Sequence, residues 1–197
     1  MIKRLAVVVV SVGLATSCSG SHTTGPGSTA PGSSRAVTTA TIGTAATDMA
    51  SRVVPSIPGY TDATAAAGGG PMRAPAGASS ELTRGFVAGY ERDFANGPAK
   101  AIIAVIEYRT TAEARTSVVA AIKEFVAQTP AAPLLPLSGI PGGIVTRAID
   151  STGTIRQAFL ASGRYVTQIA FIEPTGSSTD DSATLDRTAR AQFDRLA

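Results

Sequence analysis

The clearest alternation of hydrophobic and polar positions lies in the middle of the chain. From Phe86 to Phe94, apolar or aromatic residues alternate with smaller or charged ones, and this period of two predicts a half-buried β-strand. Asn96-Gly97-Pro98 is a turn sequence. Residues 101–108 after it are apolar at both alternating sets of positions, which is typical of a central strand. The two segments therefore predict a β-hairpin.

A helix is predicted next by its start signal and by its period. Thr110 with Glu113 three residues later is a capping-box pattern, and the helix should run to about Gln128, because Pro130 and Pro133 follow. Its apolar residues recur every three or four positions and should form one face: Ala114, Val118, Ile122, Phe125 and Val126.

Three further strands are indicated over residues 144–149, 154–161 and 164–172, with short turns at 151–153 and 162–163. Closely spaced strands with tight turns are typical of an antiparallel meander. A last helix follows, and its apolar stripe consists of Leu185, Ala189, Phe193 and Leu196.

The predicted order of elements is β-β-α-β-β-β-α, with short connections. This order predicts a single-domain α+β fold, in which an antiparallel sheet of about five strands has its helices packed on one face. We place the globular domain at residues 45–197, a usual size for one stable core. Met49, Val53 and Ile57 should begin its core, and a disordered loop is expected near 61–80, which contains three consecutive glycines.

The N-terminal residues have the pattern of an export signal. Lys3 and Arg4 supply positive charge, and Leu5–Leu14 form an apolar segment. This segment is too short for a membrane-spanning helix, which needs about 20 apolar residues. We therefore expect residues 1–17 to be a signal peptide.

The residues around Cys18 refine this expectation. Leu14-Ala15-Thr16-Ser17-Cys18 resembles the lipobox of bacterial lipoproteins, which implies cleavage before Cys18 and acylation of its sulfur. The alternatives are an ordinary leader-peptidase cut, for instance after Ala15, and an uncleaved anchor. Cys18 is the chain's only cysteine and would otherwise be a free thiol in an oxidising compartment, so chemistry also favours acylation.

A tether should follow the acylated cysteine. Residues 19–44 are mostly Ser, Thr, Gly, Pro and Ala, and such a segment cannot bury enough apolar surface to fold. We therefore assign 18–44 to the lipidated Cys18 and a flexible tether, which would hold the domain roughly 25–30 Å from the lipid.

Composition and charge exclude several classes of function. The chain has 17 Lys and Arg residues against 14 Asp and Glu, but Lys3 and Arg4 belong to the leader, so the exported chain is nearly neutral. Its basic residues are not clustered, and we expect no nucleic-acid binding. The single Cys and the single His both precede the domain. The domain therefore lacks the residues for Ser-His-Asp or Cys-His catalysis, and neither a metal nor a cofactor is expected.

A pair of carboxylates is the remaining catalytic option. Glu91 and Asp93 share one face of the first predicted strand, and Glu107 lies on the next. Two carboxylates held about 5–10 Å apart across a cleft can hydrolyse glycosidic bonds. A carboxylate-dependent hydrolase of envelope glycans is therefore the alternative function, while a solvent-facing charged surface is the simpler interpretation.

The segment 130–143 is apolar and rich in proline. Its four prolines oppose regular structure, yet Leu134, Leu135, Leu137 and Ile140 are apolar, so the segment should cover something. One interpretation is that it covers the core. The other is that it roofs a pocket for an apolar ligand, with these four residues as the candidate ligand loop.

Short motifs add a resemblance to a known group of proteins. They are Ile57-Pro58-Gly59-Tyr60, Gly85-Phe86-Val87, Glu107-Tyr108-Arg109 and Gly163-Arg164-Tyr165-Val166. Together with Cys18 and the tether, they make the chain similar to uncharacterised actinobacterial, mycobacterial-type cell-envelope lipoproteins. The resemblance implies a lipid-anchored protein on the extracytoplasmic face of the cell membrane and brings no catalytic residues. We expect a non-enzymatic protein that binds an envelope component, an apolar ligand or a partner protein.

Overall fold

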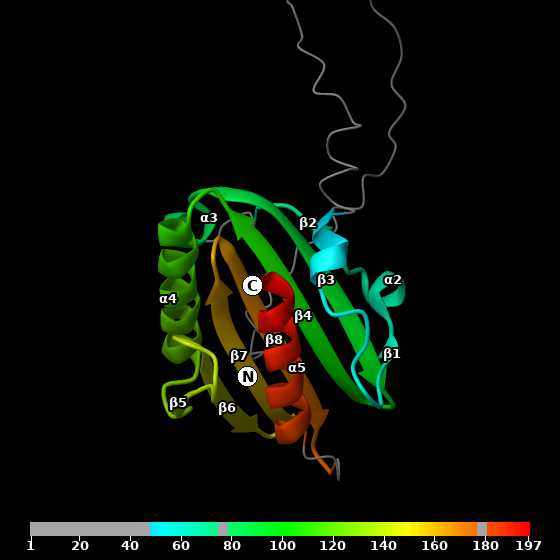
Figure 1. Ribbon diagram of the computed structural model, residues 1–197. Helices are drawn as coiled ribbons and strands as arrows, with labels where there is room; N and C mark the ends of the chain where they lie inside the picture. Colours follow the sequence, from blue (N-terminus) through cyan, green and yellow to red (C-terminus); the bar gives the residue numbers. More distant parts are fainter. Residues whose placement is uncertain (1–47, 75–78, 177–180) are drawn as a thin grey trace, which may run out of the picture.

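An antiparallel sheet forms the centre of the computed structural model, which describes residues 48–74, 79–176 and 181–197 (Figure 1). Its strands are β1 Thr61–Asp62, β2 Gly70–Met72, β3 Phe86–Asn96, β4 Ala99–Tyr108, β5 Leu134–Pro136, β6 Ile144–Asp150, β7 Gly153–Ser162 and β8 Tyr165–Pro174. The helices are α2 Thr64–Ala67, α3 Ser80–Thr83, α4 Thr111–Gln128 and α5 Ser182–Leu196. Residues 48–52 are also helical.

The strands lie in the order β1-β3-β4-β8-β7-β6-β5, and β2 pairs with β3 beside β1. Tight turns join β3 to β4 and β7 to β8, and each uses a glycine of positive φ: Gly97 at 56° and Gly163 at 55°. Ile103 of β4 lies opposite Ile169 of β8. The last strand therefore joins the first hairpin to the meander formed by β6, β7 and β8.

The predicted α+β class with an antiparallel sheet is confirmed, but the sheet has eight strands rather than about five. The five expected strands are β3, β4, β6, β7 and β8. The additional strands have only two or three residues each, which is too short for an alternating pattern to be recognised. Two of them, β1 and β2, lie with α2 in the stretch near 61–80, so residues 61–72 are ordered where a disordered loop was expected.

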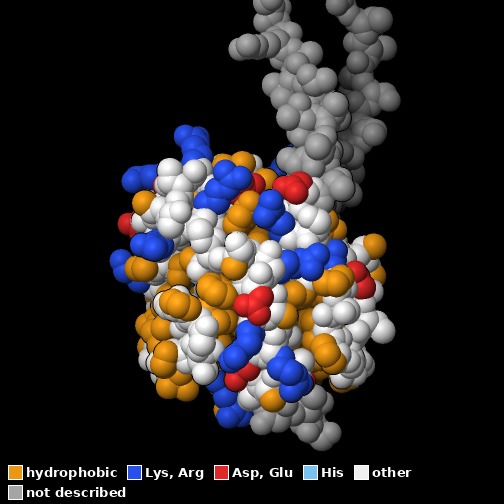
Figure 2. All heavy atoms as spheres, in the orientation of Figure 1, with side chains coloured by type: hydrophobic (Ala, Val, Ile, Leu, Met, Phe, Trp, Pro, Cys, Tyr) orange, Lys and Arg blue, Asp and Glu red, His pale blue; other side chains and the backbone are white. Residues whose placement is uncertain are grey.

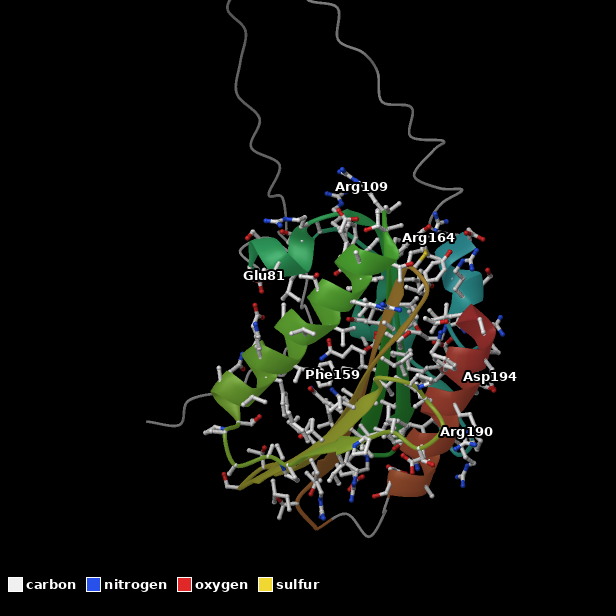
Figure 3. The ribbon with its side chains drawn as sticks, turned by 60° about the vertical axis from the view of Figure 1, so that its left-hand side comes forward. Glu81, Arg109, Phe159, Arg164, Arg190 and Asp194 are labelled. Carbon is white, nitrogen blue, oxygen red and sulfur yellow. The ribbon has the colours of Figure 1, made fainter. Side chains whose placement is uncertain are left out.

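The two long helices cover opposite faces of the sheet, and the expectation that helices pack on one face is wrong. Alternate residues of the same strands belong to two separate cores. Ile103 and Leu160 pack with α5, while Phe159 and Val166 pack with α4. Figure 3 shows α4 and α5 on either side of the strands. The physical reason is that β4, β7 and β8 are apolar on both faces, and each face needs its own cover.

The start of α4 agrees with the sequence. The Thr110 hydroxyl accepts from the Glu113 N–H, and the Glu113 carboxylate accepts from the Thr110 N–H, which completes the predicted capping box. The N-terminal segment also packs as expected, because Met49, Val53 and Ile57 are buried in the core beside α5.

Candidate functional site

The proline-rich segment after α4 forms one outer edge of the sheet. In β5 the three residues Leu134–Pro136 pair with Ile144–Thr146 of β6. Pro133 precedes this pairing and Pro136 ends it, because proline has no N–H to donate to a ladder. As a result β5 covers less than half of β6, which continues to Asp150.

The four apolar residues of the predicted ligand loop divide into two pairs. Leu137 and Ile140 are only 5% and 4% exposed and belong to the core beside α5. A tight turn directs them inward, with the Gly143 N–H donating to the Ile140 carbonyl at 3.0 Å. Leu134 and Leu135 remain 42% and 56% exposed. Leu137 and Ile140 thus cover the core. A role in ligand binding stays a prediction for Leu134 and Leu135.

Ile149, near the end of β6, is a third exposed apolar side chain at this edge of the sheet. It is 67% exposed, and three of the five large apolar side chains that are exposed in the described residues are Leu134, Leu135 and Ile149. We call these three residues the apolar edge. Figure 2 shows hydrophobic side chains gathered over β5 and the C-terminal end of α4. Sequence analysis missed Ile149, because its exposure depends on how little of β6 is covered by β5.

Two hollows lie at this edge of the sheet. The outer groove, of about 520 Å³, lies between residues 128–133 and Arg147–Ile149 of β6. The inner hollow, of about 220 Å³, lies on the α5 side and is lined by Leu135, Val145, Arg156 and Leu185, among others. Leu135 lines the inner hollow and Ile149 lines the outer groove, so the apolar edge borders two open depressions.

A buried polar network supports the inner hollow. The Arg156 guanidinium forms an ion pair with Glu173, and both side chains are almost fully buried. The Asp181 N–H donates to Glu173 at 3.3 Å, and the Tyr60 hydroxyl donates to Asp181 at 2.5 Å. Burial and then the Asp181 carboxylate raise the pKa of Tyr60 well above its usual value, so it remains a neutral donor. The network fixes β7, β8 and the start of α5 to one another.

A larger hollow lies beside the N-terminal half of α4. It has a volume of about 570 Å³ and is lined by Arg115, Val118, Val119, Pro141 and Phe193, among others. Of the five large apolar side chains that are exposed in the described residues, only Val119 lines this hollow. The β5–β6 edge therefore presents more uncovered apolar surface.

The carboxylates named from the sequence do not meet across a cleft. Glu91 and Asp93 lie on the same face of β3, next to Ala104 and Ile102 of β4. Glu107 lies on the other face of the sheet, where it forms an ion pair of 2.5 Å with Arg164. Burial raises the pKa of Glu91 to about 7, with a further contribution from the charge of Asp93. Asp93 is covered by Gly69, where a Cβ would overlap the Asp93 Oδ2 atom. The arrangement lacks the opposed pair that glycoside hydrolysis requires.

Some expectations fall outside the described residues. Cys18 and the tether lie in residues 1–47, which the structure does not describe. In the described ranges, no group of three or more His, Cys, Asp or Glu residues could hold a metal ion. No helix in those ranges is long and apolar enough to cross a membrane.

Comparison by sequence matches this chain to no protein family and to no curated protein. Among solved structures it is similar to the extracellular domain of PknH from Mycobacterium tuberculosis, with a TM-score of 0.44 and 12% identity, over 57% of this chain and 65% of that one. A protein of Bacteroides thetaiotaomicron gives a TM-score of 0.32 and 13% identity, over 52% of this chain and 35% of that one. The chain thus spans less than two thirds of the length of either structure.

Proposed function

We propose that this chain is an exported lipoprotein, anchored through Cys18 to the extracytoplasmic face of the cell membrane, whose domain binds an apolar ligand or a partner protein. The leader, the lipobox-like residues and the tether support export and anchoring. The absence of His and Cys from residues 48–197 and the separated carboxylates favour binding over catalysis.

The observation that carries this proposal is the exposure of the apolar edge. Leu134, Leu135 and Ile149 are 42%, 56% and 67% exposed. Leu135 lines the inner hollow and Ile149 lines the outer groove. Burying a large aliphatic side chain stabilises a complex by about 1.5–3 kcal/mol. Apolar side chains that the fold leaves uncovered along one edge of the sheet are therefore a favourable contact surface.

A photocrosslinking experiment tests the location of binding. The full chain, expressed in its own cell envelope, would carry p-benzoylphenylalanine at Leu135 or at Val87. Val87 is the matched control, because it is 51% exposed but lies on β3, away from the apolar edge. We expect a discrete adduct at Leu135 and none at Val87. Equal labelling at the two positions, or none at Leu135, would contradict the proposal.

A further inference from the structure

We propose that the uncovered part of β6, Arg147–Asp150, binds an extended peptide segment of a partner protein as an added β-strand, with an acidic residue of that segment beside Arg147. This inference rests on the proposed function and names the class of partner that the apolar edge would bind.

The register of the sheet leaves this part of β6 open on one side. β7 pairs with all of β6, from Ile144 opposite Phe159 to Asp150 opposite Gly153. β5 pairs only as far as Thr146. Among the described residues no strand pairs with the outer side of Arg147–Asp150. Such an edge is a ready template for another strand.

The hydrogen bonds of the neighbouring turn show which backbone groups face outward. The Leu137 N–H donates to the Gly143 carbonyl at 2.9 Å, so residue 143 directs its carbonyl away from β7. Successive residues of a strand direct their backbone groups to alternate sides. The N–H and C=O groups of residues 145, 147 and 149 are therefore also directed away from β7. Of these three residues, Arg147 and Ile149 lie beyond the end of β5.

The hairpin at the far end of β6 gives the same assignment. Asp150 lies opposite Gly153, with two residues between them. The closing pair of such a two-residue hairpin is hydrogen-bonded, which turns Asp150 towards β7. The backbone N–H and C=O groups of the preceding residue, Ile149, are therefore directed away from β7. The N–H and C=O groups of Arg147 and Ile149 are thus directed towards the outer groove.

The outer groove has the shape that an added strand needs. Its far wall consists of residues 128–133, and its volume of about 520 Å³ lies directly along Arg147–Ile149. Pro130 and Pro133 stand on that wall, and the missing N–H groups of these two residues hinder the chain's own loop from pairing with β6. Main-chain hydrogen bonds and the apolar wall would then act together on a peptide.

Charge favours an acidic peptide over a second copy of this chain. Arg147 is exposed and lies opposite Arg156 on β7, and the Arg156 guanidinium is already paired with Glu173. Among the side chains that the structure describes, no carboxylate lies within 4.0 Å of the Arg147 guanidinium. Pairing two β6 edges would place two Arg147 residues near each other, and like charges on adjacent strands are destabilising. An acidic residue would complement Arg147 instead.

The first test separates backbone pairing from side-chain contact. In the full chain with p-benzoylphenylalanine at Leu135, Ile149→Pro removes an outward N–H, while Ile149→Thr keeps it and is also β-branched. A ladder hydrogen bond is worth a factor of about five in binding. We expect the adduct yield of the proline variant to be about fivefold lower than that of the threonine variant. Melting temperatures measured by circular dichroism should be equal for the two variants, which shows that both are folded.

The second test uses charge and leaves the backbone intact. Arg147→Glu should lower the adduct about fivefold, since it replaces attraction by repulsion, whereas Arg147→Lys should retain it. The adduct yield is compared between Ile149→Pro and Ile149→Thr, and between Arg147→Glu and Arg147→Lys. Equal yields within both pairs would overturn strand addition but would not contradict the proposed function. An adduct of twice the chain mass, or with a small molecule, would also overturn it. Absence of any adduct in the parent chain would contradict the proposed function itself.

Discussion

The N–H of Val54 donates a hydrogen bond of 2.9 Å to the Oε1 atom of Gln192, 138 residues away on α5. The Nε2 atom of the same side chain donates to the Arg52 carbonyl at 2.8 Å. Gln192 is fully buried, and both ends of its amide are paired. This side chain therefore joins the first and last described segments of the chain within one core.

Gln192→Met should destabilise the domain. The substitution conserves much of the side-chain length but leaves the Val54 N–H and the Arg52 carbonyl without these partners. An unsatisfied buried backbone group costs about 1–3 kcal/mol. Denaturant unfolding of the full chain should show a loss of that size, and an unchanged midpoint would contradict the structural role given to Gln192.

Gln157→Met should have the opposite effect. Gln157 on β7 is also fully buried, yet neither its Oε1 nor its Nε2 atom has a hydrogen-bond partner among the residues that the structure describes. Burying an unpaired amide is unfavourable, so replacing it with an apolar side chain of similar size should raise the free energy of unfolding by about 1 kcal/mol. The matched comparison is Gln192→Met. Similar losses in both variants would show that Gln157 is paired after all.

Local patterns were enough to predict the long elements of this fold. The alternation in Phe86–Phe94 corresponds to β3, and Thr110 with Glu113 marks the start of α4. The placement of the helices was missed, although residues 101–108 are apolar on both sides. Periodicity shows that a strand is buried on both faces, but it does not show which helix covers each face.

The candidate site was predictable only in part. Proline and leucine together indicated that 130–143 contacts something apolar, and Leu137 and Ile140 do so. The exposure of Ile149 could not be predicted, because it follows from the length of β5 and from the order of strands in the sheet. Both are long-range properties, whereas the sequence pattern of β6 resembles that of its buried neighbours.

Stability should fall as the pH rises from about 4.5 to 7. Burial and then the charge of Asp93 raise the pKa of Glu91 from 4.5 to about 7, and burial also raises the pKa of Asp93. The folded state therefore binds more protons than the unfolded chain in this window, so deprotonation favours unfolding.

The variant that tests this pH dependence is Glu91→Gln, which removes the titrating group. It should be more stable than the parent by about 1–2 kcal/mol at pH 8 and nearly equal to it at pH 4. Glu81→Gln, at an exposed position of α3, serves as the control. Urea melts across this range would refute the prediction if the parent became more stable towards pH 7.

Cys18→Ala should abolish lipid attachment. Cys18 is the single thiol of the chain and follows the small residues Ala15, Thr16 and Ser17, so a palmitate analogue should label the parent chain and not the variant. Two acyl chains anchor a protein stably, since each buried methylene contributes about 0.8 kcal/mol. The variant should also accumulate as a larger, uncleaved precursor. Equal labelling of the two chains would rule out acylation at this residue.

The last prediction separates core coverage from binding within the proline-rich segment. Leu137 is 5% exposed and belongs to the core beside α5, whereas Leu135 is 56% exposed on β5. Leu137→Ala should therefore cost about 2–5 kcal/mol of stability, as truncations of buried leucine do. Leu135→Ala should cost less than about 1 kcal/mol, because exposed positions contribute little to the packed core.

Binding should depend on these residues in the reverse order. For this test the p-benzoylphenylalanine is moved from position 135 to position 149, so that Leu135 can itself be substituted. Leu135→Ala should then reduce the adduct by removing apolar contact area. Leu137→Ala, measured at a temperature where that variant remains folded, should retain the adduct. Denaturant melts and adduct yields of the two variants give both readouts. If Leu135→Ala lowers stability as much as Leu137→Ala and leaves the adduct unchanged, Leu135 is part of the core cover, and the binding role of the apolar edge must be abandoned at that residue.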